Sequence, residues 1–160
     1  MFAWGNPSRG DDGVGPWFAD RFRPLVDEGL SLVEDFQLQV EHLLDCREGE
    51  LLLLIDAAGN GGRDFQFEEI VADTGVAHTS HALAPAELLG YYRRVFAEPP
   101  PPAFQLAIPG ASFELGQAMS ATTESCCRRA AQFVDQLLAR PELDAWRALA
   151  RSRAGAGRIG

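Results

Sequence analysis

The chain has 160 residues, 46% of them apolar, and a formal net charge of −9, with 14 basic residues that are all arginine. Since a domain typically holds about 100–200 residues, the length and the apolar content together predict one domain with a proper core. The negative charge argues against nucleic acid or an anionic membrane surface as a partner, and the lack of lysine excludes a Walker A phosphate loop.

The stretch from Gly5 to Gly15 reads GNPSRGDDGVG and follows a short apolar run, Met1–Trp4, that predicts an abbreviated buried strand. Its first three residues favour a sharp turn, and a helix is predicted to begin at Val14. Asp11 or Asp12 is therefore placed at a strand-to-helix junction, where open α/β sheets bind ligands. Two carboxylates would repel a phosphate, so the loop favours a metal ion or a polar neutral group. The alternative is that the two acids only cap the helix.

The remaining elements alternate between strands and helices. Strands are expected at 30–38, 51–55, 65–71 and 103–108, and helices at 14–28, 40–46, 85–96 and from about 120 to the proline at 141, the last with Thr122 or Thr123 as a candidate N-cap. The continuous apolar run at 51–55 is typical of a central parallel strand, whereas the alternation at 65–71 is typical of a strand nearer an edge. This order predicts the α/β class, as a three-layer α/β/α sandwich with a twisted, mostly parallel five-stranded sheet and helices on both faces.

The last residues differ in composition from the rest of the chain. Residues 147–160 carry four arginines and no acid. We expect residues 1–146 to form the single domain and residues 147–160 to form a basic, flexible tail.

Asp56 comes directly after the predicted central strand, and an acid that follows five large apolar residues needs an explanation. It either caps the glycine-rich turn at 59–62 or contributes chemistry at the same edge of the sheet as Asp11 and Asp12. Both interpretations remain open from its position alone.

The three histidines are of unequal interest. His42 lies in a predicted helix and is expected to serve surface or partner packing. His78 and His81 are three residues apart in a predicted loop, where this spacing is weak evidence for a pair of metal ligands. His81 lies closer to the start of the predicted helix at 85–96, on the same edge of the sheet as the acids. Asp12 (or Asp11), Asp56 and His81 are therefore expected to converge. Two carboxylates and an imidazole suit a divalent first-row metal ion, which can polarise a carbonyl and activate water.

Nucleophilic catalysis is less favoured. The chain has no Gly-x-Ser-x-Gly elbow, and Ser80 adjoins a histidine only in sequence. Cys126 and Cys127 fall in the long last helix and are expected to be packing residues. With Cys46 they make three cysteines, an odd number without metal-type spacing, which predicts a reducing cytoplasm. No signal-peptide layout occurs, and no segment approaches the about 18 apolar residues of a membrane span.

Three motifs in order resemble the hydrogenase maturation proteases. They are GNPxxGDDGVG at 5–15, the apolar strand that ends in Asp56-Ala57, and Ser80-His81 ahead of a helix. These endopeptidases trim the C-terminal extension from the large subunit of NiFe hydrogenases once nickel is in place. The resemblance covers most of residues 1–140, and FQLQVEH at 36–42 is additionally similar to the subgroup that serves soluble, NAD-linked hydrogenases.

The resemblance implies an α/β/α fold and a nickel-recognising, catalytic set of two acids and a histidine. Asp12 would be the first ligand, Asp56 the second and His81 the third, with Asp11 as the neighbouring acid. The nickel would be carried by the hydrogenase large-subunit precursor, so the isolated protein need not hold it. Some relatives carry a glutamate at the Asp12 position, and the family's first strand is usually preceded by more residues than here.

Two other functions are considered. The first is a nickel-sensing chaperone that docks on the hydrogenase precursor and cuts nothing, which a cleavage assay would distinguish. The second is another hydrolase on a similar sheet, such as a peptidyl-tRNA hydrolase, against which the net charge of −9 and the missing lysines count.

Overall fold

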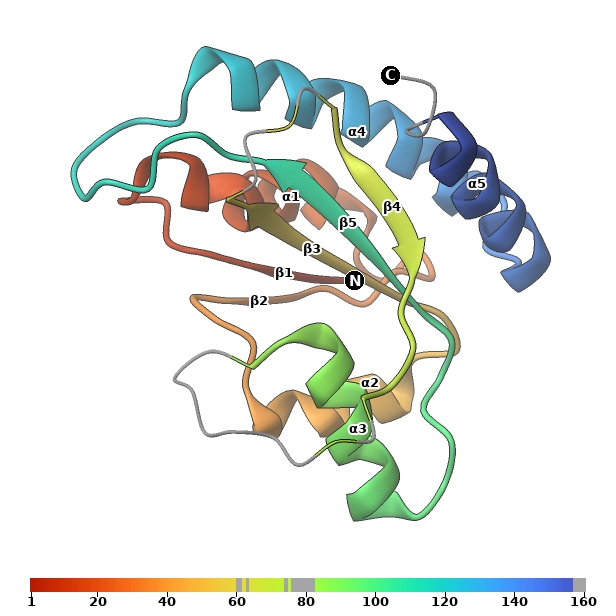
Figure 1. Cartoon of the computed structure of the whole chain (residues 1–160). Helices are drawn as coiled ribbons and strands as arrows, with labels where there is room; N and C mark the ends of the chain where they lie inside the picture. The colour runs from red at the N-terminus through yellow and green to blue at the C-terminus, as the bar shows by residue number, and fades with distance from the viewer. Residues whose placement is uncertain (60–61, 63, 74, 76–82, 157–160) are drawn as a thin grey trace.

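One twisted sheet forms the centre of the structure (Figure 1). Within residues 1–59, 62, 64–73, 75 and 83–156, which the computed structural model describes, five strands pair in the order β2-β1-β3-β5-β4. The strands are β1 (Phe2–Trp4), β2 (Val33–Asp35), β3 (Leu52–Ala58), β4 (Gln66–Glu69) and β5 (Ala103–Pro109). Neighbours are parallel except β4, which pairs antiparallel with β5 at the edge. The mostly parallel five-stranded sheet predicted from the sequence is confirmed.

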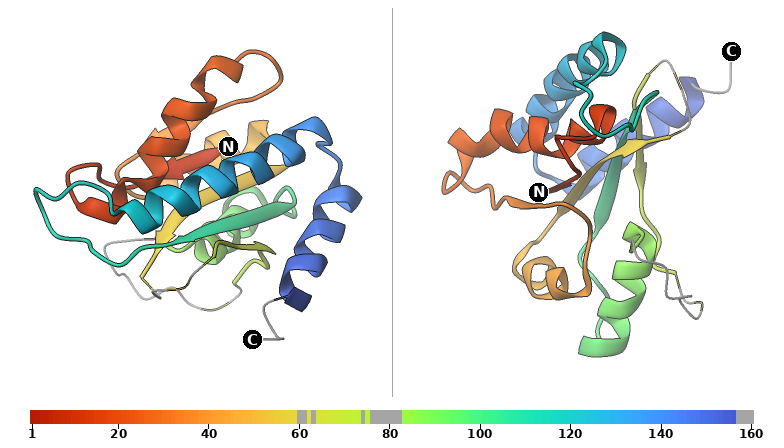
Figure 2. Two further views of the ribbon diagram at one scale, coloured as in Figure 1. Left: turned by 90° about the horizontal axis from the view of Figure 1, so that it is seen from above. Right: turned by 90° about the vertical axis from the view of Figure 1, so that its left-hand side faces the viewer.

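Helices cover both faces of this sheet (Figures 1 and 2). The α-helices are α1 (Val14–Phe22), α2 (Leu43–Glu48), α3 (Pro85–Phe96), α4 (Ala121–Ala139) and α5 (Leu143–Ala156), and the 3-10 helices are η1 (Gly10–Gly13), η2 (Arg23–Leu25) and η3 (Val40–His42). One buried cluster lies between the sheet and α1, α4 and α5, and a second lies between the sheet and α2 and α3. The three-layer sandwich is thus confirmed. In the described part of the chain, no helix is long and apolar enough to cross a membrane.

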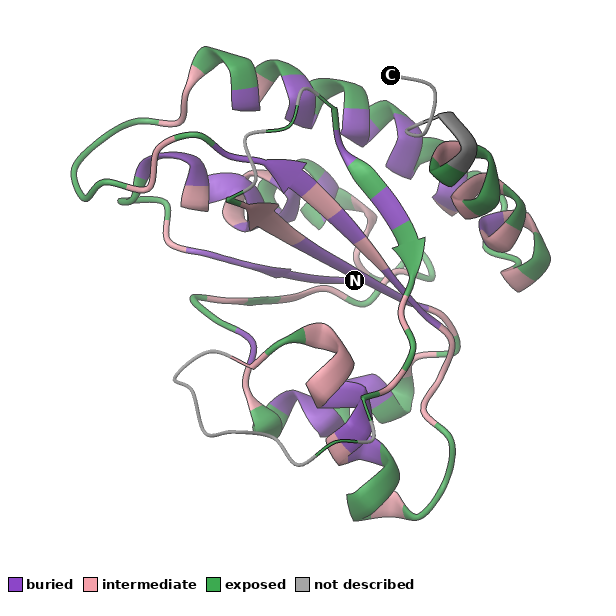
Figure 3. Cartoon of the chain, viewed as in Figure 1, coloured by how far each residue is buried: buried purple, intermediate pink, exposed green. Residues whose placement is uncertain are grey.

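The first four residues of β3 are buried on both faces (Figure 3). Leu52 and Leu54 belong to the cluster beneath α2 and α3, whereas Leu53 and Ile55 belong to the cluster beneath α1 and α4. Burying each such side chain stabilises the fold by roughly 1.5–3 kcal/mol, so this run is a central contribution to the core. The strand extends beyond its predicted end to Ala58, which places the following acid inside the strand and not after it.

Other element boundaries also differ from the prediction, and three of them have a clear cause. β2 is shorter than 30–38 because it pairs with the three residues of β1. The helix predicted for 14–28 ends at Phe22, ahead of Pro24, because a proline ring does not continue a regular helix. The N-cap of α4 is Ser120, whose hydroxyl accepts from the Thr123 amide at 3.2 Å, and not Thr122 or Thr123.

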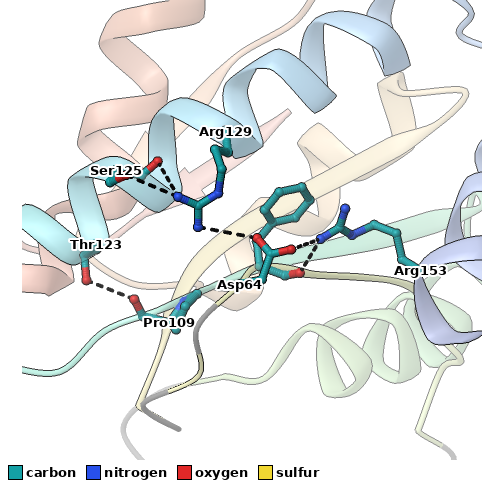
Figure 4. A network of polar contacts seen from close by, with 7 residues as sticks. Asp64, Pro109, Thr123, Ser125, Arg129 and Arg153 are labelled. Carbon is teal, nitrogen blue, oxygen red and sulfur yellow. Dashed lines mark hydrogen bonds and ion pairs between the residues drawn. The ribbon is translucent and has the colours of Figure 1, made fainter. Parts of the chain in front are cut away.

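The expectation of a flexible tail is wrong for residues 147–156, which belong to α5. The guanidinium of Arg147 pairs with Glu69 of β4 at 2.7 Å. Figure 4 shows that of Arg153, which pairs with Asp64, also at 2.7 Å. Both arginines therefore find counter-charges on and beside the edge strand, far away in sequence. These pairs fix the helix over the end of the sheet.

Candidate functional site

The connections between strands create a crevice at the carboxyl ends of β1 and β3. β1 leads through α1 on one face of the sheet to β2, and β2 leads through α2 on the other face to β3, which lies on the opposite side of β1. The chain thus leaves β1 and β3 in opposite directions, and in open α/β sheets such a point is where ligands bind. Asp12 follows β1, and Asp56 lies near the end of β3.

A cavity of about 550 Å³ opens at this point. It brings together the ends of β1 and β3, the segment after β2, the start of α3 and the loop after β5. Its described lining consists of Trp4, Arg9, Asp12, Phe36, Gln37, Leu38, Asp56, Ala57, Leu83, Ala84, Pro85 and Phe113. Asp12 and Asp56 therefore line one cavity, although they are distant in sequence.

Asp56 is the more perturbed of the two acids. Side chains alternate along a strand, so Asp56 lies on the same face as Leu54 and Trp4, beneath α2 and α3. Its pKa is raised from 3.8 to about 6, mainly by burial and additionally by the negative charge of Asp12. Hydrogen bonds from the Ala57 amide at 2.7 Å and from the Trp4 side chain act in the opposite direction. A carboxylate whose pKa is raised toward neutrality is a stronger base than an ordinary aspartate.

Asp12 is held at the mouth of the crevice by the turn after β1. Its Oδ2 accepts a hydrogen bond from the Asn6 amide at 3.0 Å. Gly5 makes this turn feasible because its φ is +145° and a Cβ there would lie 2.0 Å from the Asp12 carbonyl oxygen. The lack of a side chain at Gly5 therefore lets the backbone at Gly5 and the backbone at Asp12 approach this closely.

Asp11 has a different role from its neighbour. It is fully buried, and its carboxylate accepts hydrogen bonds from the amides of Ala111 at 2.8 Å, Ser112 at 3.1 Å and Ser120 at 2.7 Å, as well as from the Ser120 hydroxyl. Burial would raise its pKa, but these hydrogen bonds outweigh that effect and lower it. Asp11 is thus occupied in holding two loops together, which leaves Asp12 as the acid that faces the cavity.

Backbone hydrogen bonds join the same two loops. Gly10 donates to Gln117 at 3.0 Å, Asp11 donates to Ser112 at 2.8 Å, and Gly116 donates to Ser8 at 2.7 Å. The loop after β1 is therefore fixed against the loop after β5.

The third predicted ligand, His81, lies outside the described residues. Leu83, which follows it closely in the chain, lines the cavity. Among the described residues, no group of three or more histidine, cysteine, aspartate or glutamate side chains could hold a metal ion. Asp12 and Asp56 supply two hard oxygen ligands, and a closed coordination shell would need further ligands from beyond the described part or from a substrate.

His42 is not the surface residue expected from its sequence position. It is 8% exposed, and its Nε2 lies 3.3 Å from a carboxylate oxygen of Asp35. Its Nδ1 accepts from the Gln39 amide at 3.1 Å, which closes the start of η3. The histidine therefore packs beneath the segment that borders the cavity.

The two adjacent cysteines are core residues, as predicted. Cys126 and Cys127 are 1% and 0% exposed, and burial raises both pKa values, that of Cys127 to about 12. Such thiols are poor nucleophiles at neutral pH. Ser80 and His78 lie outside the described residues.

Three lining residues escaped the sequence interpretation: Trp4, Arg9 and Phe113. Arg9 lies inside the glycine-rich loop, where it was treated as a variable position, and Trp4 was assigned only to a strand. The alternation of β1 could have indicated that Trp4 shares a face with the strand-end acid. Nothing near Phe113 in sequence indicates its place.

Comparison with known proteins gives matches at the level of structure. No protein-family model matches the sequence, and no curated protein matches it. The NiFe hydrogenase maturation protease HycI of Thermococcus kodakarensis KOD1 superposes with a TM-score of 0.65 at 20% identity, over 87% of this chain and 90% of its own. The hydrogenase maturating endopeptidase HybD of Escherichia coli gives a TM-score of 0.67 at 17% identity, over 85% and 89%. The hydrogenase 2 maturation peptidase of a Thaumarchaeota archaeon gives 0.59 at 17% identity, over 86% and 95%. The chain therefore has the fold of the NiFe hydrogenase maturation proteases.

Proposed function

We propose that the protein is an endopeptidase that removes the C-terminal extension of a NiFe hydrogenase large-subunit precursor after nickel insertion. The observation that carries the proposal is that Asp12 and Asp56 line one cavity, although they come from two separate strand ends. This cavity lies at the crevice where the chain leaves β1 and β3 in opposite directions. The shared fold and the GNPxxGDDGVG motif at 5–15 support the same function.

In the proposed mechanism, the nickel of the precursor is recognised by Asp12, Asp56 and His81, which brings the scissile peptide beside the two carboxylates. Water adds to the peptide carbonyl carbon, either activated by a carboxylate or polarised by the substrate's nickel, and its proton passes to a carboxylate of the site. The C–N bond then breaks, and the proton is returned to the leaving amine. One water is consumed, and one carboxylate and one amine are formed.

The test is cleavage of a nickel-loaded precursor by the purified protein, followed on gels and by mass spectrometry. Asp56→Ala should abolish cleavage, because it removes one of the two carboxylates. Asp45→Ala, at an exposed position of α2, is the matched control and should cleave like the wild type. Unchanged cleavage by Asp56→Ala would remove this residue from the site.

The same assay addresses the chaperone alternative. A wild-type protein that forms a stable complex with the nickel-loaded precursor and leaves it uncut would be a nickel-sensing docking protein. Cleavage that depends on nickel in the precursor supports the protease.

Two finer assignments belong to this proposal. The large-subunit precursor of a soluble, NAD-linked hydrogenase is the first substrate to test, because the 36–42 segment resembles that subgroup and Phe36–Leu38 line the cavity. We place the reaction in the cytoplasm, on the basis that Cys46, Cys126 and Cys127 are free and buried thiols.

A further inference from the structure

Arg9 is the one cation among the described residues that line the cavity, where it accompanies Asp12 and Asp56. Its Nε donates to the carbonyl oxygen of Phe113 at 3.3 Å. Within the described structure, this is the side chain's single hydrogen bond, and no carboxylate pairs with it. The two terminal NH2 groups of an exposed guanidinium are therefore available at the cavity.

The backbone holds Arg9 in a defined place. Its amide donates to the Asn6 carbonyl at 3.0 Å, and its carbonyl accepts from the Asp12 amide at 3.2 Å. The hydrogen bond to Phe113 then ties its side chain to the loop after β5. Because these two loops are also joined by their own backbone hydrogen bonds, the loop that carries Arg9 is fixed before any substrate arrives, and the bond to Phe113 directs its guanidinium to the cavity. Preorganised donors of this kind act without reorganising during the reaction.

Charge explains why such a donor is needed. Addition of hydroxide to a peptide carbonyl moves the π electron pair onto the carbonyl oxygen, which becomes an oxyanion. In this cavity the new negative charge would develop beside Asp12 and Asp56. A nearby cation with free N–H groups lowers the energy of that state.

Resting on the proposed proteolytic function, we infer that Arg9 is a catalytic residue that donates hydrogen bonds to the carbonyl oxygen of the scissile peptide and stabilises the oxyanion formed on it. When the oxyanion collapses, the C–N bond breaks and the guanidinium releases a neutral carbonyl. Arg9 only donates hydrogen bonds in this step, and the proton of the attacking water passes to a carboxylate of the site, as in the proposed mechanism.

The experiment measures kcat and KM for nickel-loaded precursor with wild-type protein, Arg9→Gln, Arg9→Lys and the control Arg151→Gln, which lies on α5 at the opposite face of the sheet. Loss of an oxyanion donor lowers kcat by about 10²–10³-fold. We expect Arg9→Gln to show such a loss with KM changed less than about threefold. Arg9→Lys should recover part of the rate, since it restores a point charge without the forked geometry. Arg151→Gln should match the wild type.

Each result has one interpretation. A rise in KM at unchanged kcat would overturn the inference and make Arg9 a ground-state binding residue, for example for a substrate carboxylate. Unchanged kinetics of Arg9→Gln would overturn it as well. If the wild type itself leaves the precursor uncut, the proposed function fails and the inference fails with it. The melting temperature of each variant is measured beside the kinetics. If Arg9→Gln folds poorly, the rate of Arg9→Lys is compared with that of the wild type, provided that their melting temperatures are similar.

Discussion

Replacing Asp56 by asparagine should stabilise the protein while removing the proposed proteolytic activity. In the native state, burial and the neighbouring Asp12 raise the pKa of Asp56 from 3.8 to about 6. The folded state therefore binds a proton that the unfolded state releases, so this group lowers the stability progressively as the pH rises from about 4 through 6. Asparagine has the same shape, accepts from the Ala57 amide through its carbonyl oxygen, and carries no charge at any pH.

The magnitude follows from the size of the shift. A difference of about two pKa units corresponds to a cost of about 3 kcal/mol once Asp56 is ionised in both states. Near pH 4.5 Asp56 is still protonated in the folded protein, and it lowers the free energy of unfolding by only about 1 kcal/mol. Asp56→Asn should therefore raise the free energy of unfolding by about 1 kcal/mol near pH 4.5 and by about 3 kcal/mol near pH 7.5. The latter corresponds to roughly 6–12 °C in melting temperature for a chain of this size.

Urea unfolding at both pH values measures the difference directly. Asp45→Asn, an exposed aspartate on α2, serves as the control and should show no comparable gain with pH. A variant at position 56 that is no more stable near pH 7.5 than near pH 4.5 would refute the reasoning, because the ionised carboxylate would then carry no cost in the fold. A strained group at a functional site, retained at the expense of stability, is the expected pattern for a catalytic acid.

Three further changes test the structure around the site. Asp11→Ala should lower the free energy of unfolding by at least about 3 kcal/mol at neutral pH, and the difference should shrink as the pH falls through the lowered pKa of Asp11; a pH-independent loss would contradict the role of its charge. Gly5→Ala should lower the free energy of unfolding by about 3 kcal/mol or more, because the new Cβ would lie 2.0 Å from a carbonyl oxygen at a positive φ. A urea midpoint equal to that of the wild type would show that the turn has another shape. Arg153→Ala should cost about 1–2 kcal/mol and speed amide hydrogen exchange in α5, since its guanidinium lies 3.6 Å over the Phe65 ring; unchanged exchange would mean that the helix is held elsewhere.

The fold could be predicted largely because apolar runs decide it. The run at 51–55 is long enough only for a strand and apolar enough only for the centre of the sheet, and β3 is found there. The tail could not be predicted, because the acids that pair with Arg147 and Arg153 lie 78 and 89 residues earlier in the chain. A local sequence window does not contain them.

The sequence could indicate that Asp12 and Asp56 come together, as their shared cavity shows, but not the different roles of Asp11 and Asp12. Asp11 and Asp12 are adjacent and chemically identical, so only the backbone geometry of η1 shows that one faces a set of amides and the other the cavity. Asp56 gains its raised pKa from burial that depends on where the strand ends. Arg9 sits at a loop position that local patterns leave open.

The bonds of Asp11 also set the order in which the molecule can mature during synthesis. Its partners lie 100, 101 and 109 residues further along the chain, and β5, which inserts between β3 and β4, is made after both. While the polypeptide is emerging from the ribosome, the first loop therefore has no counterpart to close against. The crevice is completed only when the last third of the chain is free, so in a nascent copy the cavity lined by Asp12 and Asp56 is not yet assembled.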